Sequence, residues 1–399
     1  MAQHTVNADV VLMGGGIAGL YLLQLLQQKG YNCILLETQT LGSGQTLQSQ
    51  GIIHGGMKYA LSGALNSESD AIKEMPDRWR KLLRKDEDID LSATQINCER
   101  FYMWSAGRLA SKFATFFASK VVRGRIQKLE RTQYPSAFDN NDFHGSLYKL
   151  SDFVVDSASL LQNLLRNVEN RAVKIKSVTQ FKFDACGDRV ESITAELDNG
   201  DELVLKTGAT IFTAGQGNEA LCAQAKVQYA PMQLRPLHMT MVKHNMPHNL
   251  FAHCVGTSSK PRITVTTHTC NDGKKVWYLG GDLSETGIER NEGQQIDAAQ
   301  QELKQLFPWL DFSSSQWATF FIDRAEPKQS SLNKPDRAYT HIEKNIIVSW
   351  PTKLTLAPDL GDQILQALEH LHVNPNGNTP LITALPQADI GSPAWENLF

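Results

Sequence analysis

The sequence predicts an α/β fold, α+β overall, in which a parallel, doubly wound sheet is joined to a second, mainly antiparallel sheet. Residues 8–37 contain an apolar strand pattern, a glycine turn, a helical pattern and a second apolar strand, which is the βαβ order. Residues 238–243, 262–267 and 275–281 are short and rich in β-branched and aromatic side chains. Asn271-Asp272-Gly273 separates the last two and is a hairpin signal, so these strands are expected to run antiparallel.

The composition is that of an ordinary globular protein. The 399 residues are 41% hydrophobic and 20% charged, which suits two domains or one large composite. A net charge of −3 gives no indication of nucleic-acid binding. The six cysteines are scattered, which favours reduced thiols in the cytoplasm, and we expect no metal site. Without a secretory leader or a long apolar run, we expect no transmembrane segment, although peripheral membrane contact stays open.

The glycine turn has the spacing G-x-G-x-x-G and predicts a Rossmann-like dinucleotide site. Gly14 allows a tight turn, Gly16 allows the backbone to approach a pyrophosphate, and Gly19 allows close packing of helix on strand. The helix N-terminus then faces the phosphates with its partial positive charge. Glu37 ends the second strand and can accept hydrogen bonds from ribose hydroxyls, which disfavours a 2′-phosphate. These residues alone do not choose between NAD and FAD.

Residues 43–61 read SGQTLQSQGIIHGGMKYAL, a composition that suits neither a helix nor a strand. The stretch resembles the flavin loop of the D-amino-acid-oxidase superfamily, most closely its glycerol-3-phosphate dehydrogenase and 2-hydroxyglutarate dehydrogenase branches. In that family a Ser-rich segment ending in H-G/S-G-x-R-Y runs along the pyrophosphate and the isoalloxazine, and this chain has His54-Gly55-Gly56-Met57-Lys58-Tyr59. A flat ring needs backbone rather than side chains beside it, and glycine permits that approach. We call residues 43–61 the flavin loop.

The resemblance continues beyond the flavin loop. Val178 looks like the strand valine that holds the adenine through its backbone, and residues 209–217 look like the strand that returns under the cofactor. Residues 349–355 resemble the family's G-G-K-x-T loop, which opens a final helix toward the pyrimidine edge of the flavin. Pro351-Thr352 replaces the paired glycines and Pro358 replaces an arginine, so the backbone contacts there depart from the family pattern.

The resemblance implies a non-covalently bound FAD. The residues that it implies as cofactor contacts are Gly14, Gly16, Ile17, Ala18, Gly19, Glu37, Thr38, Gly44, Gln45, Thr46, Ser49, Gln50, Gly51, Ile52, Val178, Thr213, Ala214, Gly215, Lys353, Leu354 and Thr355.

The same resemblance implies a discontinuous domain organisation. The expected ranges are 1–95, 150–225 and 330–372 for the FAD-binding domain, 96–149 and 226–329 for the substrate domain, and 373–399 for a C-terminal tail. The tail is expected to wrap the surface or to be partly disordered, with a docking role for Trp395 and Phe399 as one alternative.

The implied chemistry is oxidation of a substrate C–H bond by hydride transfer to flavin N5. Lys353, at the start of the last helix, is the predicted cation near flavin N1 and O2, with a surface lysine as the alternative. An alcohol substrate also needs a base for its hydroxyl proton, and histidine suits that role near neutral pH. The candidates are His54 in the flavin loop and His238, whose segment resembles a strand that brings a histidine over the flavin; both stay open.

An anionic substrate is predicted from three cations. Lys58 stands at the arginine position of the H-G-G-x-R-Y pattern, beside Tyr59, and Arg235 lies on a predicted strand of the substrate domain. Arg324 looks like the arginine that family members place above the flavin to hold a carboxylate or a phosphate. The substrate classes are therefore a hydroxy acid, an amino acid or a polyol phosphate, and a carboxylate is favoured at least as much as a phosphate.

Two other functions compete with this prediction. Gly280-Gly281-Asp282 superficially resembles the second flavin motif of monooxygenases of the hydroxybenzoate type, but no helix carrying a proline follows, so a strand end is favoured. A non-enzymatic partner-binding protein on the same fold ranks last. Such proteins usually lose a phosphate glycine or the acid after the second strand, and this chain keeps both. The electron acceptor is open between oxygen, a quinone and a carrier protein.

Overall fold

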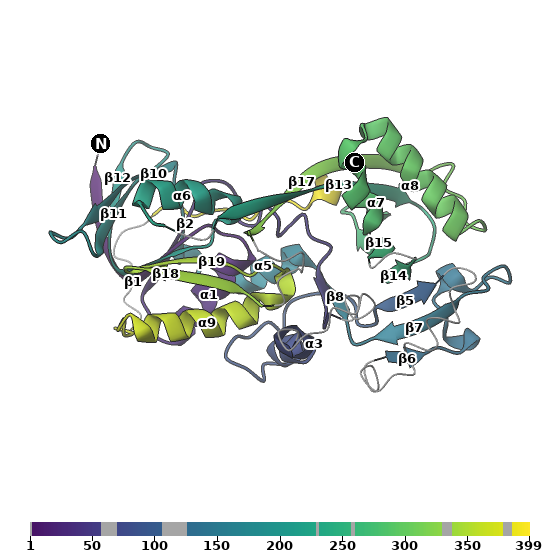
Figure 1. Cartoon of the computed structure of the whole chain (residues 1–399), viewed down its shortest axis with the longest axis horizontal. Coiled ribbons are helices and arrows are strands. Elements are labelled where there is room, and N and C mark those ends of the chain that lie inside the picture. Colours follow the sequence, from purple (N-terminus) through teal and green to yellow (C-terminus); the bar gives the residue numbers. More distant parts are fainter. Residues whose placement is uncertain are drawn as a thin grey trace.

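The structure is a computed structural model, and it describes residues 2–56, 70–105, 126–228, 231–256, 260–328, 337–377 and 385–399. The molecule is elongated, with a parallel sheet and its helices in one half and a largely antiparallel sheet in the other (Figure 1). Lys58 and Tyr59 lie outside the described residues. Among the described helices, none combines the length and the apolar character needed to cross a bilayer.

The first sheet has the order β10-β11-β12-β1-β2-β9. β11 pairs with the N-terminal part of β12, β19 pairs with the C-terminal part of β12, and β18 pairs with β19. Its strands are β1 (Gln3–Met13), β2 (Cys33–Glu37), β9 (Ala172–Lys174), β10 (Ser177–Phe183), β11 (Val190–Glu196), β12 (Glu202–Phe212), β18 (Tyr339–Glu343) and β19 (Ile346–Trp350). β12, β1, β2 and β9 run parallel, as does β19 to β12. Val10, Val11 and Leu12 are fully buried because helices cover both faces of this sheet. The parallel α/β unit predicted from residues 8–37 is confirmed.

Helices on the two faces of the first sheet belong to separate clusters of buried side chains. Helix α1 (Ile17–Gln28) packs against α5 (Ser157–Leu165) and α9 (Ala357–His370) in the larger cluster. Helix α6 (Asn218–Ala225) belongs to the cluster on the other face. Asp156 begins α5 by accepting a hydrogen bond from the Ser159 backbone N–H at 2.7 Å.

The second sheet has the order β17-β13-β16-β15-β14-β5-β7-β6. Its strands are β5 (Tyr102–Ser105), β6 (Ile126–Lys128), β7 (Ser146–Leu150), β13 (Met232–His244), β14 (Ala252–Val255), β15 (Pro261–Thr269), β16 (Lys275–Gly280) and β17 (Gln316–Pro327). Its described pairs are antiparallel except β14 with β5. β15 and β16 form the predicted hairpin, with Gly273 at φ +79° in the turn. Helix α8 (Glu292–Leu306) covers one face of this sheet.

A small third sheet lies where the two halves meet. It consists of β3 (Ile52–Ile53), β8 (Phe153–Val155) and β4 (Ile96–Cys98), and α3 (Asp70–Leu83) packs beside β3. The described strands of the first sheet all come from the three ranges predicted for the FAD-binding domain. The domain boundaries themselves stay a prediction.

The described part of the tail, residues 385–399, connects the two halves. Leu41 donates a backbone hydrogen bond to Asp389 at 2.8 Å, which fixes the tail against the first half. At the other end Trp395 is 2% exposed and stacks on His268 of β15, with ring centroids 3.8 Å apart. Phe399 lies under the Lys243 ammonium, 5.5 Å from the nitrogen to the ring centroid. This segment therefore docks on the second sheet rather than extending into solvent.

Candidate functional site

The carboxyl ends of β1, β2, β12 and β19 meet at one edge of the first sheet, which we call the cofactor edge. Gly14 follows β1 with φ +111°, and a Cβ placed on it would lie 2.4 Å from the Ala214 Cα beyond β12. A Cβ on Gly19 would lie 2.0 Å from the Gly14 carbonyl oxygen. Both positions therefore require glycine, Gly19 for the predicted close packing of helix on strand and Gly14 for an approach to the chain after β12 that the sequence did not predict.

The N-terminus of α1 opens at the cofactor edge. Gly16 precedes the helix and offers no side chain to cap it. The Thr46 hydroxyl of the flavin loop accepts a hydrogen bond from the Ile17 N–H at 2.9 Å. Backbone N–H groups and the helix dipole favour an anion here, which suits a pyrophosphate. Gly44 of the flavin loop is exposed, and no atom of the described residues lies within 4 Å of a Cβ placed on it.

Glu37 at the end of β2 connects the turn to the following loop. One carboxylate oxygen accepts from the Gly15 N–H and the other from the Gln39 N–H, both at 2.7 Å. A carboxylate has about four lone-pair positions, so two remain for ribose hydroxyls. Thr38 lies next in the chain, and its carbonyl oxygen accepts a hydrogen bond from the Lys174 ammonium.

The flavin loop is held against the second sheet by two reciprocal contacts. The Tyr278 hydroxyl donates to the Gln48 carbonyl oxygen at 2.7 Å, and the Gln50 amide donates to the Tyr278 carbonyl oxygen at 2.8 Å. Gly51 has φ +67°, and a Cβ there would lie 2.1 Å from the Val155 carbonyl oxygen. Burial raises the pKa of Tyr278 above its usual range, so its hydroxyl stays protonated as a donor. The described part of the loop is therefore fixed in position.

His54 meets the C-terminal loop at the end of β3. The Thr355 hydroxyl accepts from the His54 N–H and donates to the His54 carbonyl oxygen, both at 3.3 Å. The ring Nδ1 accepts from the Gly56 N–H at 3.3 Å, which places the proton of a neutral imidazole on Nε2. The Gly55 N–H donates to the Asp152 carboxylate at 3.0 Å. His54 is 6% exposed, so its orientation is set by the surrounding backbone.

Lys353 lies at the cofactor edge, in the loop that follows β19. It precedes the 3₁₀ turn η8 (Leu354–Leu356), which leads directly into α9. Thr352 adopts φ +60°, so the loop keeps a left-handed residue although Pro351-Thr352 replaces the paired glycines. The Trp350 indole donates to the Gly215 carbonyl oxygen at 3.0 Å and joins this loop to the end of β12. Lys353 thus lies before η8 and α9, which is not the last helix because α10 (Ala394–Asn397) follows, and its predicted place near the flavin stays a prediction.

Several cofactor-edge contacts were not anticipated from the sequence. Asn218 accepts at its side-chain oxygen from the Ala214 N–H at 2.8 Å and donates to the Ser349 carbonyl oxygen at 3.0 Å. Thr213 bonds back to the Gly14 carbonyl oxygen at 2.8 Å. Asn218 is the first residue of α6 but does not cap it, because its side chain bonds to Ala214, four residues earlier, so the local sequence held no signal for these contacts. The Val178 carbonyl oxygen accepts from the Gln224 amide at 2.8 Å, and its predicted contact with adenine stays a prediction.

His238 lies on the other face of β13 from the flavin loop. Its neighbours Met239 and Met241 pack with Tyr278, which contacts the loop, and successive strand residues point to opposite faces. The His238 Nδ1–H donates to the Gly287 carbonyl oxygen at 3.0 Å, and the ring stacks on Phe321 with centroids 4.0 Å apart. The structure thus does not bring His238 and His54 together.

Arg235 and Arg324 are brought together although they are far apart in the sequence. They occupy directly opposite positions of the antiparallel pair β13–β17, so their side chains lie on one face; we call them the arginine pair. Arg235 forms an ion pair with the buried Glu326 at 3.0 Å. The Arg324 Nε is buried without a hydrogen bond to any described residue.

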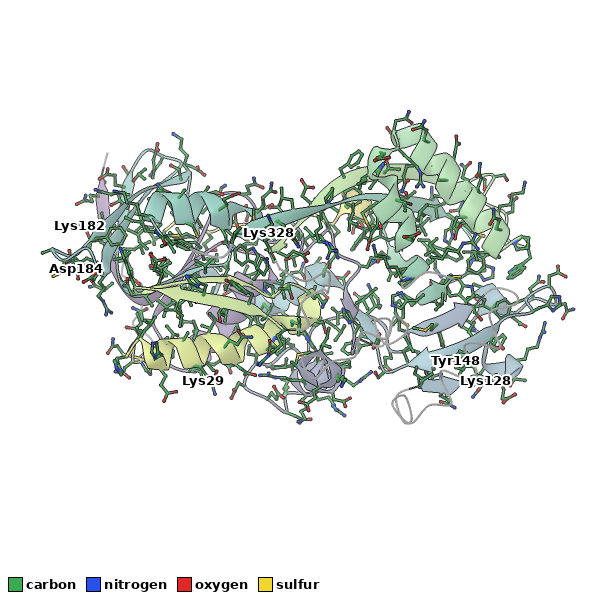
Figure 2. The ribbon with its side chains drawn as sticks, in the orientation of Figure 1. Lys29, Lys128, Tyr148, Lys182, Asp184 and Lys328 are labelled. Carbon is green, nitrogen blue, oxygen red and sulfur yellow. The ribbon has the colours of Figure 1, made fainter. Side chains whose placement is uncertain are left out.

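The arginine pair belongs to the segment that bridges the two halves. β17 contacts the turn η6 (Gly215–Gly217) of the cofactor edge. Lys328, which follows β17, lies between the halves in Figure 2. Arg235 lies near the start of β13 and Arg324 near the end of β17, so the arginine pair lies at the end of these paired strands that is nearer to the cofactor edge.

Comparison with known proteins agrees with this geometry. The family model for FAD-dependent oxidoreductases, DAO, matches residues 9–332. The chain belongs to this family. It is 42% identical, over 405 residues and 99% of each chain, to a Pseudomonas aeruginosa protein named a probable FAD-dependent oxidoreductase. The crystal structure of the FAD-dependent oxidoreductase of that organism superposes with a TM-score of 0.85 at 36% identity, covering 98% of each chain.

More distant structures share the fold. L-α-glycerophosphate oxidase from Mycoplasma pneumoniae, solved with FAD bound, has a TM-score of 0.63 at 14% identity and covers 94% of this chain and 100% of its own. Glycine oxidase from Geobacillus kaustophilus has a TM-score of 0.66 at 14% identity and covers 91% and 95%. This protein is therefore an enzyme with FAD as its cofactor, and the predicted combination of a parallel sheet with a mainly antiparallel one is confirmed.

Proposed function

We propose that the enzyme oxidises a C–H bond of a small anionic substrate and that the arginine pair binds the anionic group. The observation that supports this most strongly is the register of β13 and β17, which sets Arg235 directly opposite Arg324. Like charges in directly opposite positions destabilise a sheet, and Glu326 neutralises only one of them. A substrate carboxylate or phosphate supplies the missing negative charge.

The buried Arg324 Nε adds a second reason for an anionic ligand. A buried donor without a partner costs about 1–3 kcal/mol, and more when the group is charged. A carboxylate that accepts two parallel hydrogen bonds from the guanidinium would remove this cost and fix the substrate orientation. A lysine could supply the positive charge, but it lacks the planar guanidinium that donates two parallel hydrogen bonds to one carboxylate.

Residues of the cofactor edge are proposed to hold the FAD. The glycine turn and the α1 N-terminus would receive the pyrophosphate, Glu37 would receive the ribose, and the described part of the flavin loop would lie beside the ring system. FAD supplies the hydride acceptor, the ring nitrogen N5. Lys353 places a positive charge at the start of η8, where negative charge develops near flavin N1 and O2.

His54 is proposed as the histidine on the substrate side. It lies in the flavin loop, whereas His238 lies on the opposite face of β13. With Nδ1 accepting from the Gly56 N–H, a neutral His54 carries its proton on Nε2 and would meet a substrate oxygen as a hydrogen-bond donor, not as the base for its proton. His54→Gln should therefore lower kcat/KM for an alcohol substrate, whereas His238→Gln should leave it unchanged.

The substrate is proposed to be a hydroxy acid, an amino acid or a polyol phosphate. Similarly folded enzymes include glycine oxidase and L-α-glycerophosphate oxidase, but identities of 14% support the fold alone. The acceptor of the electrons is proposed to be oxygen, a quinone or a carrier protein. The test is an anaerobic screen in which amino acids, hydroxy acids and phosphorylated polyols are added to the yellow enzyme. Bleaching of the flavin by an anionic compound is expected, and bleaching only by neutral alcohols or amines would overturn the proposal.

A further inference from the structure

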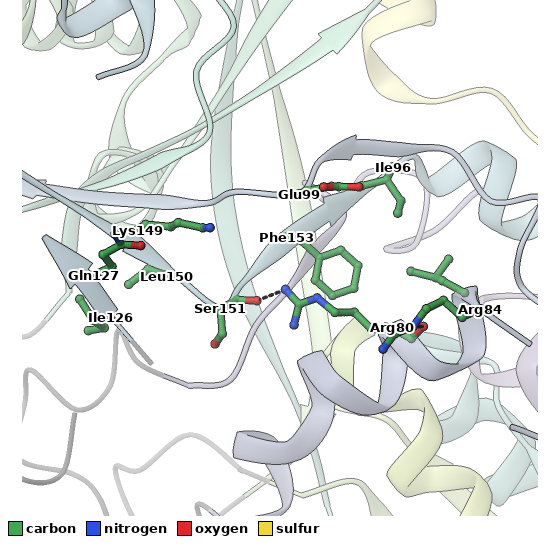
Figure 3. Close-up of a pocket in the computed structure, with 11 residues that line it drawn as sticks. Arg80, Arg84, Ile96, Glu99, Ile126, Gln127, Lys149, Leu150, Ser151 and Phe153 are labelled. Carbon is green, nitrogen blue, oxygen red and sulfur yellow. Dashed lines mark hydrogen bonds between the residues drawn. The ribbon is translucent and has the colours of Figure 1, made fainter. Parts of the chain in front are cut away.

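A half-open cavity of about 720 Å³ lies between α3 and strands of the second and third sheets (Figure 3). Its volume is typical of small-molecule sites. The predicted cofactor and substrate residues that the structure describes do not line it. Trp79, on another face of α3, donates to the Thr355 carbonyl oxygen at 2.8 Å, whereas Arg80 and Arg84 line the cavity. The helix thus separates the cavity from the cofactor edge.

Among the described residues, the charged lining of the cavity is predominantly positive. Arg80 and Arg84 come from α3, Lys149 comes from β7, and Glu99 is the acid among the described lining residues. Figure 3 shows the Lys149 and Arg80 side chains extending into the cavity from opposite sides. The Lys149 ammonium has neither a hydrogen bond nor an ion pair with any residue that the structure describes, although its backbone pairs within the sheet. Arg84 forms an ion pair with Asp86 at 3.8 Å, and both side chains are exposed. Exposed ion pairs contribute little to stability.

Arg80 is held in place before any ligand arrives. Its guanidinium donates to the Ser151 carbonyl oxygen at 2.5 Å and lies over the Phe153 ring, 4.8 Å from the centroid. A cation fixed in this way loses little conformational freedom on binding an anion.

Apart from Gln127 and Ser151, the remaining described lining of the cavity is apolar. Leu150 and Phe153 are each 2% exposed, and Leu83 and Ile126 also line the cavity. Ile96 leaves 39% of its surface exposed, although a large apolar side chain gains free energy when it is covered. The cavity therefore offers apolar surface together with Lys149, which no described acid neutralises, and with Arg80, whose ion pair with Asp77 at 3.3 Å is largely exposed to solvent.

We propose that this cavity binds a small amphiphile with an anionic head group and an apolar body. The head group pairs with Lys149 and Arg80, and the apolar body covers Ile96 and the neighbouring side chains. This site is separate from the proposed substrate site at the arginine pair. Its ligand should bind without changing the environment of the flavin.

The test uses the FAD-loaded enzyme and isothermal titration calorimetry with decanoate below its micelle concentration. Decanol has the chain without the charge, phosphate has charge without the chain, and decyltrimethylammonium has the opposite charge. We expect saturable one-site binding of decanoate at the cavity and at least tenfold weaker binding of the other three. Decanoate could also bind at the arginine pair. Binding there should perturb the flavin bands and disappear in Arg324→Lys, which distinguishes it from binding at the cavity.

Matched variants assign the binding to the cavity. Lys149→Met should weaken decanoate binding about tenfold by removing one charged partner. Lys128→Met is the control, because Lys128 lies on the adjacent strand β6, is exposed and does not line the cavity (Figure 2). Ile96→Asn should also weaken decanoate binding, since it removes exposed apolar surface without changing charge.

The outcomes separate the possible sources of the ligand. Binding to vesicles of anionic phospholipid that Lys149→Met abolishes would identify the amphiphile as a membrane lipid, whereas decanoate binding alone would identify a free carboxylate. The proposal is overturned if decanoate shows no saturable binding outside the flavin site. It is also overturned if decanol binds as tightly, or if Lys149→Met and Lys128→Met behave alike.

Discussion

In the first sheet the site residues lie in loops at the ends of four parallel strands, whereas in the second sheet they lie within two long paired strands. Gly14 directly follows β1 and Glu37 is the last residue of β2, so the end of one strand places each of them. Arg235 and Arg324 are placed by the register of β13 against β17. The first arrangement depends on local backbone conformation, and the second on long-range strand pairing. The two halves should therefore respond differently to substitution.

The largest effect is expected from Gly14→Ala in the first half. A Cβ there would overlap the Ala214 backbone, and φ +111° is unfavourable for any L-residue with a side chain. We expect the variant to purify without FAD, as measured by the absorbance of the flavin relative to the protein. Gly293→Ala is the control, because a Cβ at that position would have no contact closer than 3.7 Å. Full FAD content in Gly14→Ala would contradict the close approach of β1 and β12.

Next in size is Arg324→Lys in the second half. The charge is kept but the planar fork is lost, so kcat/KM should fall by about 10²–10³, while FAD content stays normal. Steady-state kinetics with a substrate from the anaerobic screen measure this effect. Arg166→Lys, at an exposed position of the first half, is the matched control. Loss of FAD together with activity would show that Arg324 supports the fold rather than the substrate.

Acid should destabilise the second half specifically. Burial lowers the pKa of His268 to about 3, from an ordinary value of 6.5, so the unfolded chain binds the proton more readily than the folded one. The stabilisation is complete above pH 6.5 and decreases as the pH falls. By pH 5 the free energy of unfolding should have decreased by about 2 kcal/mol. Urea unfolding at pH 7 and pH 5 measures the loss. His268→Gln should reduce the difference between the two pH values, whereas His370→Gln, at an exposed position, should not.

The smallest effect is expected from Lys353→Met at the cofactor edge. Removing the charge should lower the flavin reduction potential by about 30 mV, equivalent to about 1.4 kcal/mol for two electrons. A dye-coupled reductive titration measures the potential. Lys206→Met is the control, since Lys206 is exposed and lies on β12 well before its carboxyl end. An unchanged potential in Lys353→Met would make this residue an ordinary surface lysine.

The difference between the halves also explains what the sequence could predict. The glycine turn and Glu37 were predictable because each role depends on residues close together in the chain. The hairpin at Asn271-Asp272-Gly273 was predictable for the same reason. The pairing of Arg235 with Arg324, the Tyr278 contact with Gln48, and the docking of Trp395 join residues far apart in the chain. Such contacts depend on strand register and packing, which the local sequence does not specify.

His238 is a residue that the local sequence suggested for the site but that the fold places on the opposite face of the sheet. A histidine on a predicted strand could face either side of the sheet, and one residue of register decides which. In the structure its ring contacts Gly287 and Phe321, away from the flavin loop. The local sequence suggested a histidine for the site, but only the fold determines which face it occupies.

The central claim, that the arginine pair binds an anionic substrate beside the flavin, is tested most directly by a spectral titration. Acetate, benzoate, glycolate and phosphate are added separately to the oxidised enzyme while the flavin bands are recorded. The account predicts a saturable change with at least one anion, and at least tenfold weaker binding of that anion to Arg324→Lys than to Arg166→Lys. No spectral change with any anion, together with a fully active Arg324→Lys enzyme, would contradict it.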